Sequence, residues 1–111
     1  MSLSPLWWRK FKAWLAPRRQ VLVVDGDTLP IDLPARDLVL ARDDGEDWSV
    51  GMVCPCGCGE RLELMLLAHV KPRWTMALDA NQNPSLHPSV WRQTGCCSHL
   101  WLRGGKIYWC D

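Results

Sequence analysis

The chain has 111 residues and a formal net charge of +1, with 48% hydrophobic and 23% charged residues. This length corresponds to about one domain, and the composition excludes wholesale disorder. The near-zero net charge argues against a protein that binds nucleic acid mainly by electrostatic attraction, and no run of about 18 uncharged apolar residues could cross a bilayer. Six cysteines and eight tryptophans are the unusual features of the composition.

The first 19 residues have the pattern of a basic amphipathic helix. Ser4 suits the N-cap, Pro5 suits the first helical position, and Pro17 ends the pattern. Apolar side chains recur at helical spacing at Trp7, Phe11, Trp14 and Leu15. We expect residues 1–19 to form a helical arm and residues 20–111 to form a β domain. The arm either covers one edge of that domain or docks on a membrane surface or a partner protein.

Beyond the arm the apolar pattern changes to short runs separated by turn residues, which is typical of β-strands. We expect residues 21–24 and 28–31 to pair as a hairpin across Asp25-Gly26, a favoured two-residue turn. Further strands are expected at residues 37–42, 48–53, 61–67, 74–79, 98–103 and 106–110. The pattern therefore predicts a mainly β fold, a small antiparallel β domain.

Five of the six cysteines lie in two short segments. Residues 54–59 read CPCGCG and residues 96–99 read CCSH. Because we recognise no secretory signal, we expect a cytoplasmic protein whose thiols stay reduced and bind metal instead of forming disulfides. Two such segments separated by β structure are typical of a zinc-ribbon-like site. We expect a structural Zn²⁺, because a thiolate-rich site rarely keeps a position open for catalysis.

The residues leave the fourth ligand open. Alternation along a strand places Cys97 and His99 on one face and turns Cys96 to the other. If Gly104-Gly105 forms a two-residue turn, Cys110 lies directly opposite His99. Cys97, His99 and Cys110 are therefore all candidates to complete the set that residues 54–59 begin.

A serine and a histidine are candidates for chemistry. Ser89 follows a turn and lies among bulky residues, and a hydroxyl becomes a nucleophile only with a base in hydrogen-bond reach. His99 is the candidate base if it does not bind the metal. His69 and His87 are more typical of packed or surface histidines. No G-x-S-x-G nucleophile motif is present.

Three of these motifs together resemble a known family. They are CPCGCG at 54–59, Pro-Ser-Val at 88–90 and CSHLWLR at 97–103. Over residues 20–111 the chain resembles BubE, a component of bacterial operons that encode ubiquitin-like conjugation machinery. The resemblance implies a compact zinc-binding fold and a serine-peptidase-like role, trimming or releasing a ubiquitin-like protein at its C-terminus. It implies Ser89 as nucleophile, His99 as general base and a metal held by Cys54, Cys56, Cys58 and Cys97.

Two functions from different classes follow. The first is a peptidase that acts on a ubiquitin-like partner. The second is a non-enzymatic, zinc-stapled adaptor that binds a partner protein through exposed tryptophans and the basic arm. Nucleic-acid binding is disfavoured, because residues 21–60 hold nine acids against two arginines and contain no recognised reading motif. Contact between Ser89 and His99 separates the first two functions, because an adaptor does not need it.

Overall fold

The computed structural model describes residues 17–92, 95–96 and 99–110 of the chain. These residues form nine strands in three sheets. They contain no helix, and so none that is long and apolar enough to cross a membrane. The mainly β fold is confirmed. The helix was expected within residues 1–19, and residues 1–16 lie outside the described residues. The domain boundary at residue 20 stays a prediction.

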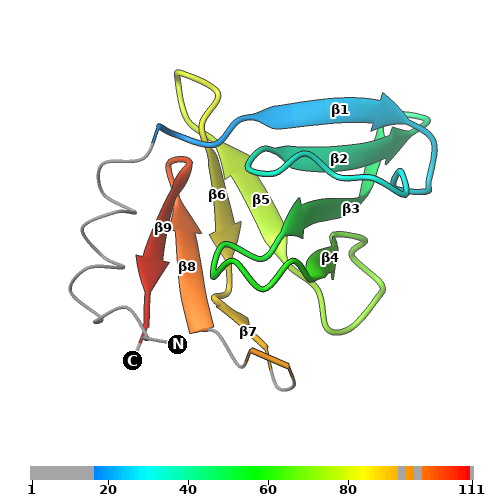
Figure 1. Cartoon of the computed structure of the whole chain (residues 1–111). Coiled ribbons are helices and arrows are strands. Elements are labelled where there is room, and N and C mark those ends of the chain that lie inside the picture. The colour runs from blue at the N-terminus through cyan, green and yellow to red at the C-terminus, as the bar shows by residue number, and fades with distance from the viewer. Residues whose placement is uncertain (1–16, 93–94, 97–98, 111) are drawn as a thin grey trace.

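The largest sheet has four strands in the order β1-β2-β3-β4 (Figure 1). The strands are β1 at Val21–Asp25, β2 at Leu38–Asp43, β3 at Glu46–Val53 and β4 at Arg61–Met65. β2 and β3 form a hairpin whose turn, Asp44-Gly45, has φ values of 53° and 76°. The strands expected at residues 37–42 and 48–53 are therefore confirmed, with their ends shifted by one or two residues.

The hairpin expected between residues 21–24 and 28–31 is wrong. β1 instead pairs parallel to β2, and residues 26–37 form the connection between the two strands. The Gly26 N–H donates a hydrogen bond to the Arg42 carbonyl at 2.8 Å. The chain therefore stays in register with β2 past Asp25-Gly26 instead of reversing there.

The apolar residues of this connection cover a face of the sheet. Leu29 is buried and packs with Val39 and Ala41 of β2. The fit is close, because a Cβ added to Gly51 of β3 would lie 2.9 Å from Leu29 Cδ1. Pro30, which has no N–H to donate, also suits a covering loop better than a paired strand. The apolar residues that indicated a strand at residues 28–31 therefore belong to a loop that packs onto the sheet.

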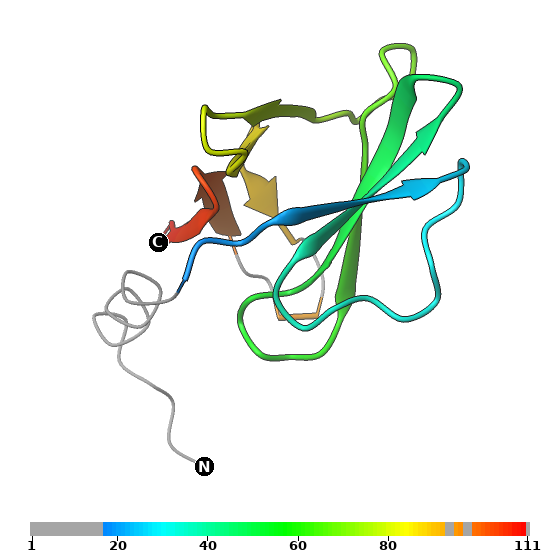
Figure 2. The ribbon, with the colours of Figure 1, turned by 90° about the horizontal axis from the view of Figure 1, so that it is seen from above.

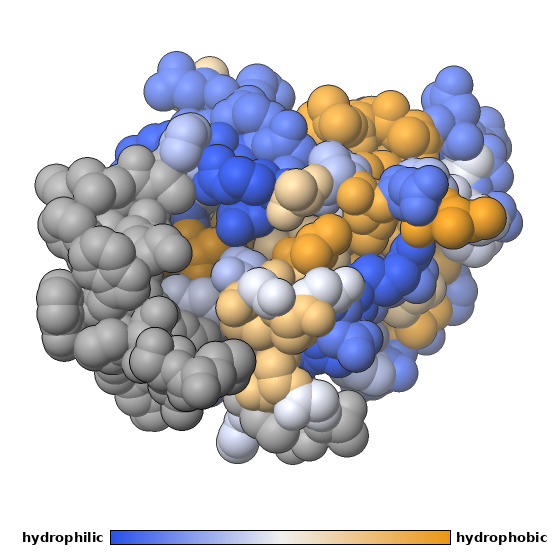
Figure 3. Space-filling view, in the orientation of Figure 1, coloured by the Kyte–Doolittle hydropathy of each residue, from blue (hydrophilic) through white to orange (hydrophobic). Residues whose placement is uncertain are grey.

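Hydrophobic side chains also reach the surface over β1 and the connection that follows it (Figure 3). Leu22 and Val23 are half-exposed, and Ile31 is 91% exposed. β1 is an outer strand of its sheet. This part of the described surface is therefore apolar at a sheet edge, a place that folded proteins usually protect with charge.

Two smaller sheets face the large one across the core (Figure 2). One pairs β5, Thr75–Leu78, with β6, Pro84–His87. The other has the order β7-β8-β9, with bounds Val90–Trp91, His99–Arg103 and Lys106–Trp109. β6 and β7 were not expected from the sequence. β6 begins at Pro84, the strand position that best tolerates a missing N–H.

The register of β8 and β9 agrees with the sequence prediction. Arg103 pairs with Lys106 across Gly104-Gly105. The pairing continues to the far end of the hairpin, where the Cys110 N–H donates to the His99 carbonyl at 2.8 Å. The turn therefore places Cys110, the residue after β9, opposite His99.

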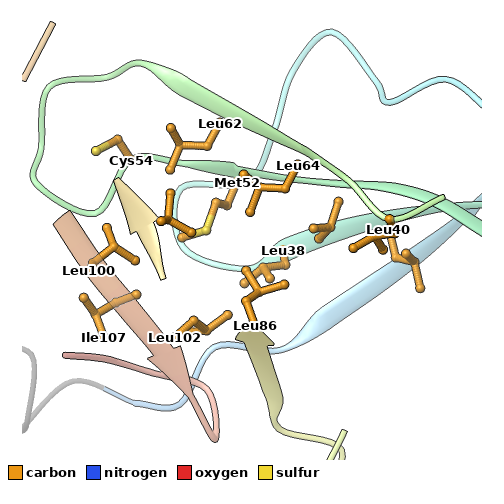
Figure 4. Packing of buried hydrophobic residues seen from close by; sticks show 13 residues of the cluster. Leu38, Leu40, Met52, Cys54, Leu62, Leu64, Leu86, Leu100, Leu102 and Ile107 are labelled. Atoms are coloured by element: carbon orange, nitrogen blue, oxygen red, sulfur yellow. The ribbon is translucent and has the colours of Figure 1, made fainter. Parts of the chain in front are cut away.

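The main hydrophobic core lies between the large sheet and the smaller ones (Figure 4). Leu38, Leu40 and Met52 reach it from the large sheet, and Leu100 and Leu102 reach it from β8. Each of these side chains is at most 1% exposed. Burial of one such side chain contributes about 1.5–3 kcal/mol. The core therefore fixes β8, and with it the first residue of that strand, against the large sheet.

Gly105 is the point where three segments meet, and its replacement by alanine is expected to be costly. Its carbonyl accepts a hydrogen bond from the Arg19 N–H, and its own N–H donates to the Pro84 carbonyl, both at 2.7 Å. Its φ is +80°, and an added Cβ would lie 2.8 Å from the Arg19 carbonyl oxygen. Gly45→Ala is the matched control, because Gly45 has a φ of +76° and nothing within 4 Å of an added Cβ.

We expect Gly45→Ala to lower the free energy of unfolding by about 1–2 kcal/mol through backbone strain alone. Gly105→Ala carries the same strain and in addition a steric cost of about 1–3 kcal/mol. Urea denaturation of both variants measures the difference. Equal losses would contradict the close approach of residue 19 to this turn.

Candidate metal centre and catalytic pair

The CPCGCG segment forms the loop between β3 and β4. Cys54 directly follows β3, and its N–H donates to the Glu60 carbonyl at 2.8 Å, which closes the loop. Gly57 and Gly59 have φ values of +94° and +82°. Side chains with a Cβ rarely adopt this conformation. The two glycines therefore allow a turn tight enough to bring three thiols together.

Four cysteine sulfurs gather at this loop. They belong to Cys54, Cys56 and Cys58 of the loop and to Cys96, which lies shortly before β8, and all lie within 4.8 Å of one another. Cys54 Sγ is 3.4 Å from Cys56 Sγ and 3.6 Å from Cys96 Sγ. A tetrahedral ion with metal–sulfur bonds of about 2.3 Å holds its sulfurs about 3.8 Å apart. The four side chains therefore fit a metal ion.

The cluster lies at the margin of the hydrophobic core. Cys54 is only 2% exposed and belongs to the same apolar cluster as Leu62 (Figure 4), whereas Cys58 is exposed. Burial raises the pKa of the Cys54 thiol to about 12. Without a cation this sulfur therefore keeps its proton at neutral pH. A metal ion has to displace the proton to gain the thiolate, so metal binding is coupled to proton release.

The structure brings together three of the expected ligands, Cys54, Cys56 and Cys58. The fourth sulfur is that of Cys96, and the expectation that Cys96 turns away is wrong. That expectation assumed a strand running through residue 96, but β8 begins only at His99. Cys97 lies outside the described residues. The alternative ligands His99 and Cys110 are not part of the described group.

Ser89 and His99 are brought together by the pairing of β7 with β8. The two strands are antiparallel, with Val90 opposite Leu100 and Trp91 opposite His99. Ser89 directly precedes β7, and its Oγ lies 2.8 Å from His99 Nε2. This is the distance at which a general base can accept a hydroxyl proton. The pair therefore has the geometry of a nucleophile and its base.

Aromatic side chains hold both members of the pair. The Trp74 Nε1–H donates to the Ser89 carbonyl at 3.4 Å. The Trp91 ring stacks on the His99 imidazole, with centroids 5.0 Å apart and an interplanar angle of 16°. Within the part of the chain that the structure describes, no carboxylate is hydrogen-bonded to the His99 ring. Among the described residues, the contacts of the His99 ring are thus the Ser89 hydroxyl and the Trp91 indole.

Arg92 contacts two sulfurs of the cysteine cluster. Its Nη1 is 3.9 Å from Cys58 Sγ and 4.0 Å from Cys96 Sγ. Neither Arg92 nor Trp91 was expected as a site residue. The one sequence signal for them is their position, because both follow the Pro-Ser-Val segment directly.

The other two histidines lie apart from this contact. His69 is exposed in the segment after β4. His87 is exposed at the end of β6, and its ring centroid lies 5.8 Å from that of Trp101. Of the three histidines, His99 is the one hydrogen-bonded to Ser89.

Comparison with known proteins identifies the family. Residues 26–110 match the family model of the bacterial ubiquitination-like system serine protease, BubE. No protein with a curated description matches the chain, and no solved structure matches it. The matched region is about three quarters of the chain and includes the four clustered cysteines and the Ser89–His99 pair. The chain therefore belongs to the BubE family.

Proposed function

We propose that this chain is a zinc-stabilised serine protease that processes the C-terminus of a ubiquitin-like protein, or releases that protein, in a bacterial conjugation pathway. The observation that carries the proposal is the 2.8 Å contact between Ser89 Oγ and His99 Nε2. It occurs in a chain whose family is described as a serine protease of a bacterial ubiquitination-like system. A non-enzymatic adaptor would not need this contact. The proposed location is the cytoplasm, as expected from the sequence, because thiols stay reduced there.

In the proposed mechanism Ser89 Oγ attacks the carbonyl carbon of the scissile bond while His99 Nε2 accepts the hydroxyl proton. His99 then gives this proton to the leaving nitrogen as the C–N bond breaks, which leaves an ester on Ser89. Water then attacks the ester carbonyl while His99 accepts a proton from the water. The C–O bond to Ser89 breaks, the carboxylic acid is released, and His99 returns the proton to Ser89 Oγ. Backbone N–H groups near Cys96 and Cys97 are the proposed donors that stabilise the oxyanion.

Zn²⁺ is the metal that suits the cluster best, because four thiolates at tetrahedral spacing are typical of structural zinc sites. Four protein ligands leave no open position for a substrate, so the ion has a structural role. It would join the loop at residues 54–59 to Cys96, three residues before β8 begins. The ion would thereby help to fix the start of the strand that carries His99.

The test is to incubate the zinc-loaded protein with the ubiquitin-like precursor of a bacterial conjugation operon and to measure intact masses. We expect a product shortened at its C-terminus with the wild type and none with Ser89→Ala. His87→Gln is the matched control, because this exposed histidine lies two residues from Ser89 and is expected to leave cleavage unchanged. Equal cleavage by wild type and Ser89→Ala would remove Ser89 from the mechanism. A stable complex without cleavage would support the adaptor instead.

A further inference from the structure

A short segment connects the metal cluster to the catalytic pair. Ser89 precedes β7, Trp91 ends it, and Arg92 follows. Ser89 contacts His99, Trp91 stacks on His99, and Arg92 reaches the sulfurs of the cluster. Four consecutive residues therefore carry the nucleophile, the support of its base and a contact to the metal ligands.

The stacking of Trp91 can set the orientation of the imidazole. Trp91 is 59% exposed, so its position owes little to burial in the core. Its backbone pairs with that of His99, which brings the two side chains to the same face of the sheet. A catalytic base needs a third group that fixes its ring. The nearly parallel indole, at 16° to the imidazole, can supply that support.

Arg92 links the position of Trp91 to the charge of the cysteine cluster. Four thiolates around a divalent cation carry a formal charge of about −2, whereas four protonated thiols carry none. The guanidinium group, 3.9 Å from Cys58 Sγ and 4.0 Å from Cys96 Sγ, is therefore attracted far more strongly to the loaded cluster. Loading the metal would hold Arg92, and with it the end of β7, in place.

We propose that the metal centre sets the orientation of His99 through Arg92 and Trp91. Arg92 and Trp91 are thus positioning residues, and they act on Ser89 only through His99. The inference rests on the proposed function in one respect, namely that Ser89 and His99 are the reacting pair. The inference gives the metal a role beyond stabilising the fold, because the geometry of Ser89 and His99 would depend on whether the metal is bound.

The position of the His99 ring can be read directly by NMR. In protein with ¹³C-labelled histidine the ring protons of only three residues are seen, and His99→Gln assigns the signal of interest. In the zinc-loaded wild type we expect His99 ring protons upfield of those of the exposed His69, because the indole face shields them. Trp91→Leu is expected to remove this displacement. Arg92→Gln is expected to remove most of it while zinc is still bound.

Arg103→Gln is the matched control for Arg92→Gln. Arg103 is an exposed arginine of β8 whose guanidinium carbon lies 4.5 Å from the Trp101 ring centroid, and it makes no contact with the clustered sulfurs. It is expected to leave the His99 signals unchanged. On the precursor substrate Arg92→Gln is expected to lower kcat on the order of tenfold, since small misplacements of reacting groups are costly. KM is expected to change less than about twofold.

His99 signals and kcat at wild-type values in zinc-saturated Arg92→Gln would overturn the proposal. If that variant does not fold, Trp91→Leu and Trp91→Phe decide, because they leave Arg92 in place. Phe is expected to keep a stacked ring and a higher kcat than Leu, and a wild-type kcat in Trp91→Leu would also refute the proposal. The NMR result needs no substrate. If Ser89→Ala still cleaves while the stack depends on Arg92, the proposed function fails and the coupling stands.

Discussion

Replacing Cys54 by serine is expected to leave most of the protein unfolded at neutral pH. Cys54 is 2% exposed, and its sulfur lies within 3.6 Å of two other cluster sulfurs. Structural zinc sites contribute about 10–16 kcal/mol of apparent binding free energy, whereas a whole domain has a net stability of about 5–15 kcal/mol. If the cluster holds zinc as proposed, loss of one ligand removes a large part of the stability. Circular dichroism and urea denaturation measure the loss.

Cys110→Ser is the matched control, because Cys110 lies outside the described group of clustered sulfurs. It is expected to bind one zinc ion per chain and to unfold at the wild-type urea concentration. Since burial raises the pKa of Cys54 to about 12, the ion must displace a proton there, and zinc affinity is expected to rise with pH. A Cys54→Ser variant as stable as the wild type would show that the cluster does not support the fold.

Ser89→Ala, His99→Gln and the double variant are each expected to lower kcat by a similar factor, on the order of 10⁴ or more. A nucleophile and its base act as a unit, so removal of either one removes most of what the pair contributes. The 2.8 Å contact between Ser89 Oγ and His99 Nε2 is the physical basis of this coupling. Turnover of the ubiquitin-like precursor at saturating concentration measures kcat.

The kcat of the double variant shows whether Ser89 and His99 act together or independently. If Ser89 and His99 act separately, the double variant should lose the product of the two single losses. Thermal denaturation of all three variants should match the wild type, because neither side chain belongs to the hydrophobic core. A strictly multiplicative loss would contradict a shared role in proton transfer.

Local signals predicted part of the fold, and longer-range packing decided the rest. The β8–β9 register followed from Gly104-Gly105, because a two-residue turn fixes the pairing of the residues around it. The same type of argument failed at Asp25-Gly26. There the outcome depends on a twelve-residue connection, 26–37, whose Leu29 packs on the sheet and lets β2 run parallel to β1. The preference of Asp-Gly for a tight turn does not include the free energy gained by burying Leu29.

In the candidate site, too, the contacts that are local in sequence could be predicted and the long-range ones could not. The thiols of residues 54–59 are close in sequence, so their convergence could be predicted from spacing. Cys96 could not be assigned, because it lies in a loop before β8, where strand alternation does not hold. The contact of Ser89 with His99 depends on the pairing of a two-residue strand, β7, which has no pattern of its own. The residues alone made Ser89 and His99 candidates, and the resemblance to a known family implied their roles as nucleophile and general base.

Covalent labelling of Ser89 tests the central claim most directly. The zinc-loaded protein is treated with an alkyl fluorophosphonate, which reacts with activated serines, and its peptides are then analysed by mass spectrometry. We expect one adduct on Ser89 in the wild type and none in His99→Gln under the same conditions. An adduct on a different serine, or equal labelling of Ser89 in both proteins, would contradict a nucleophile activated by His99.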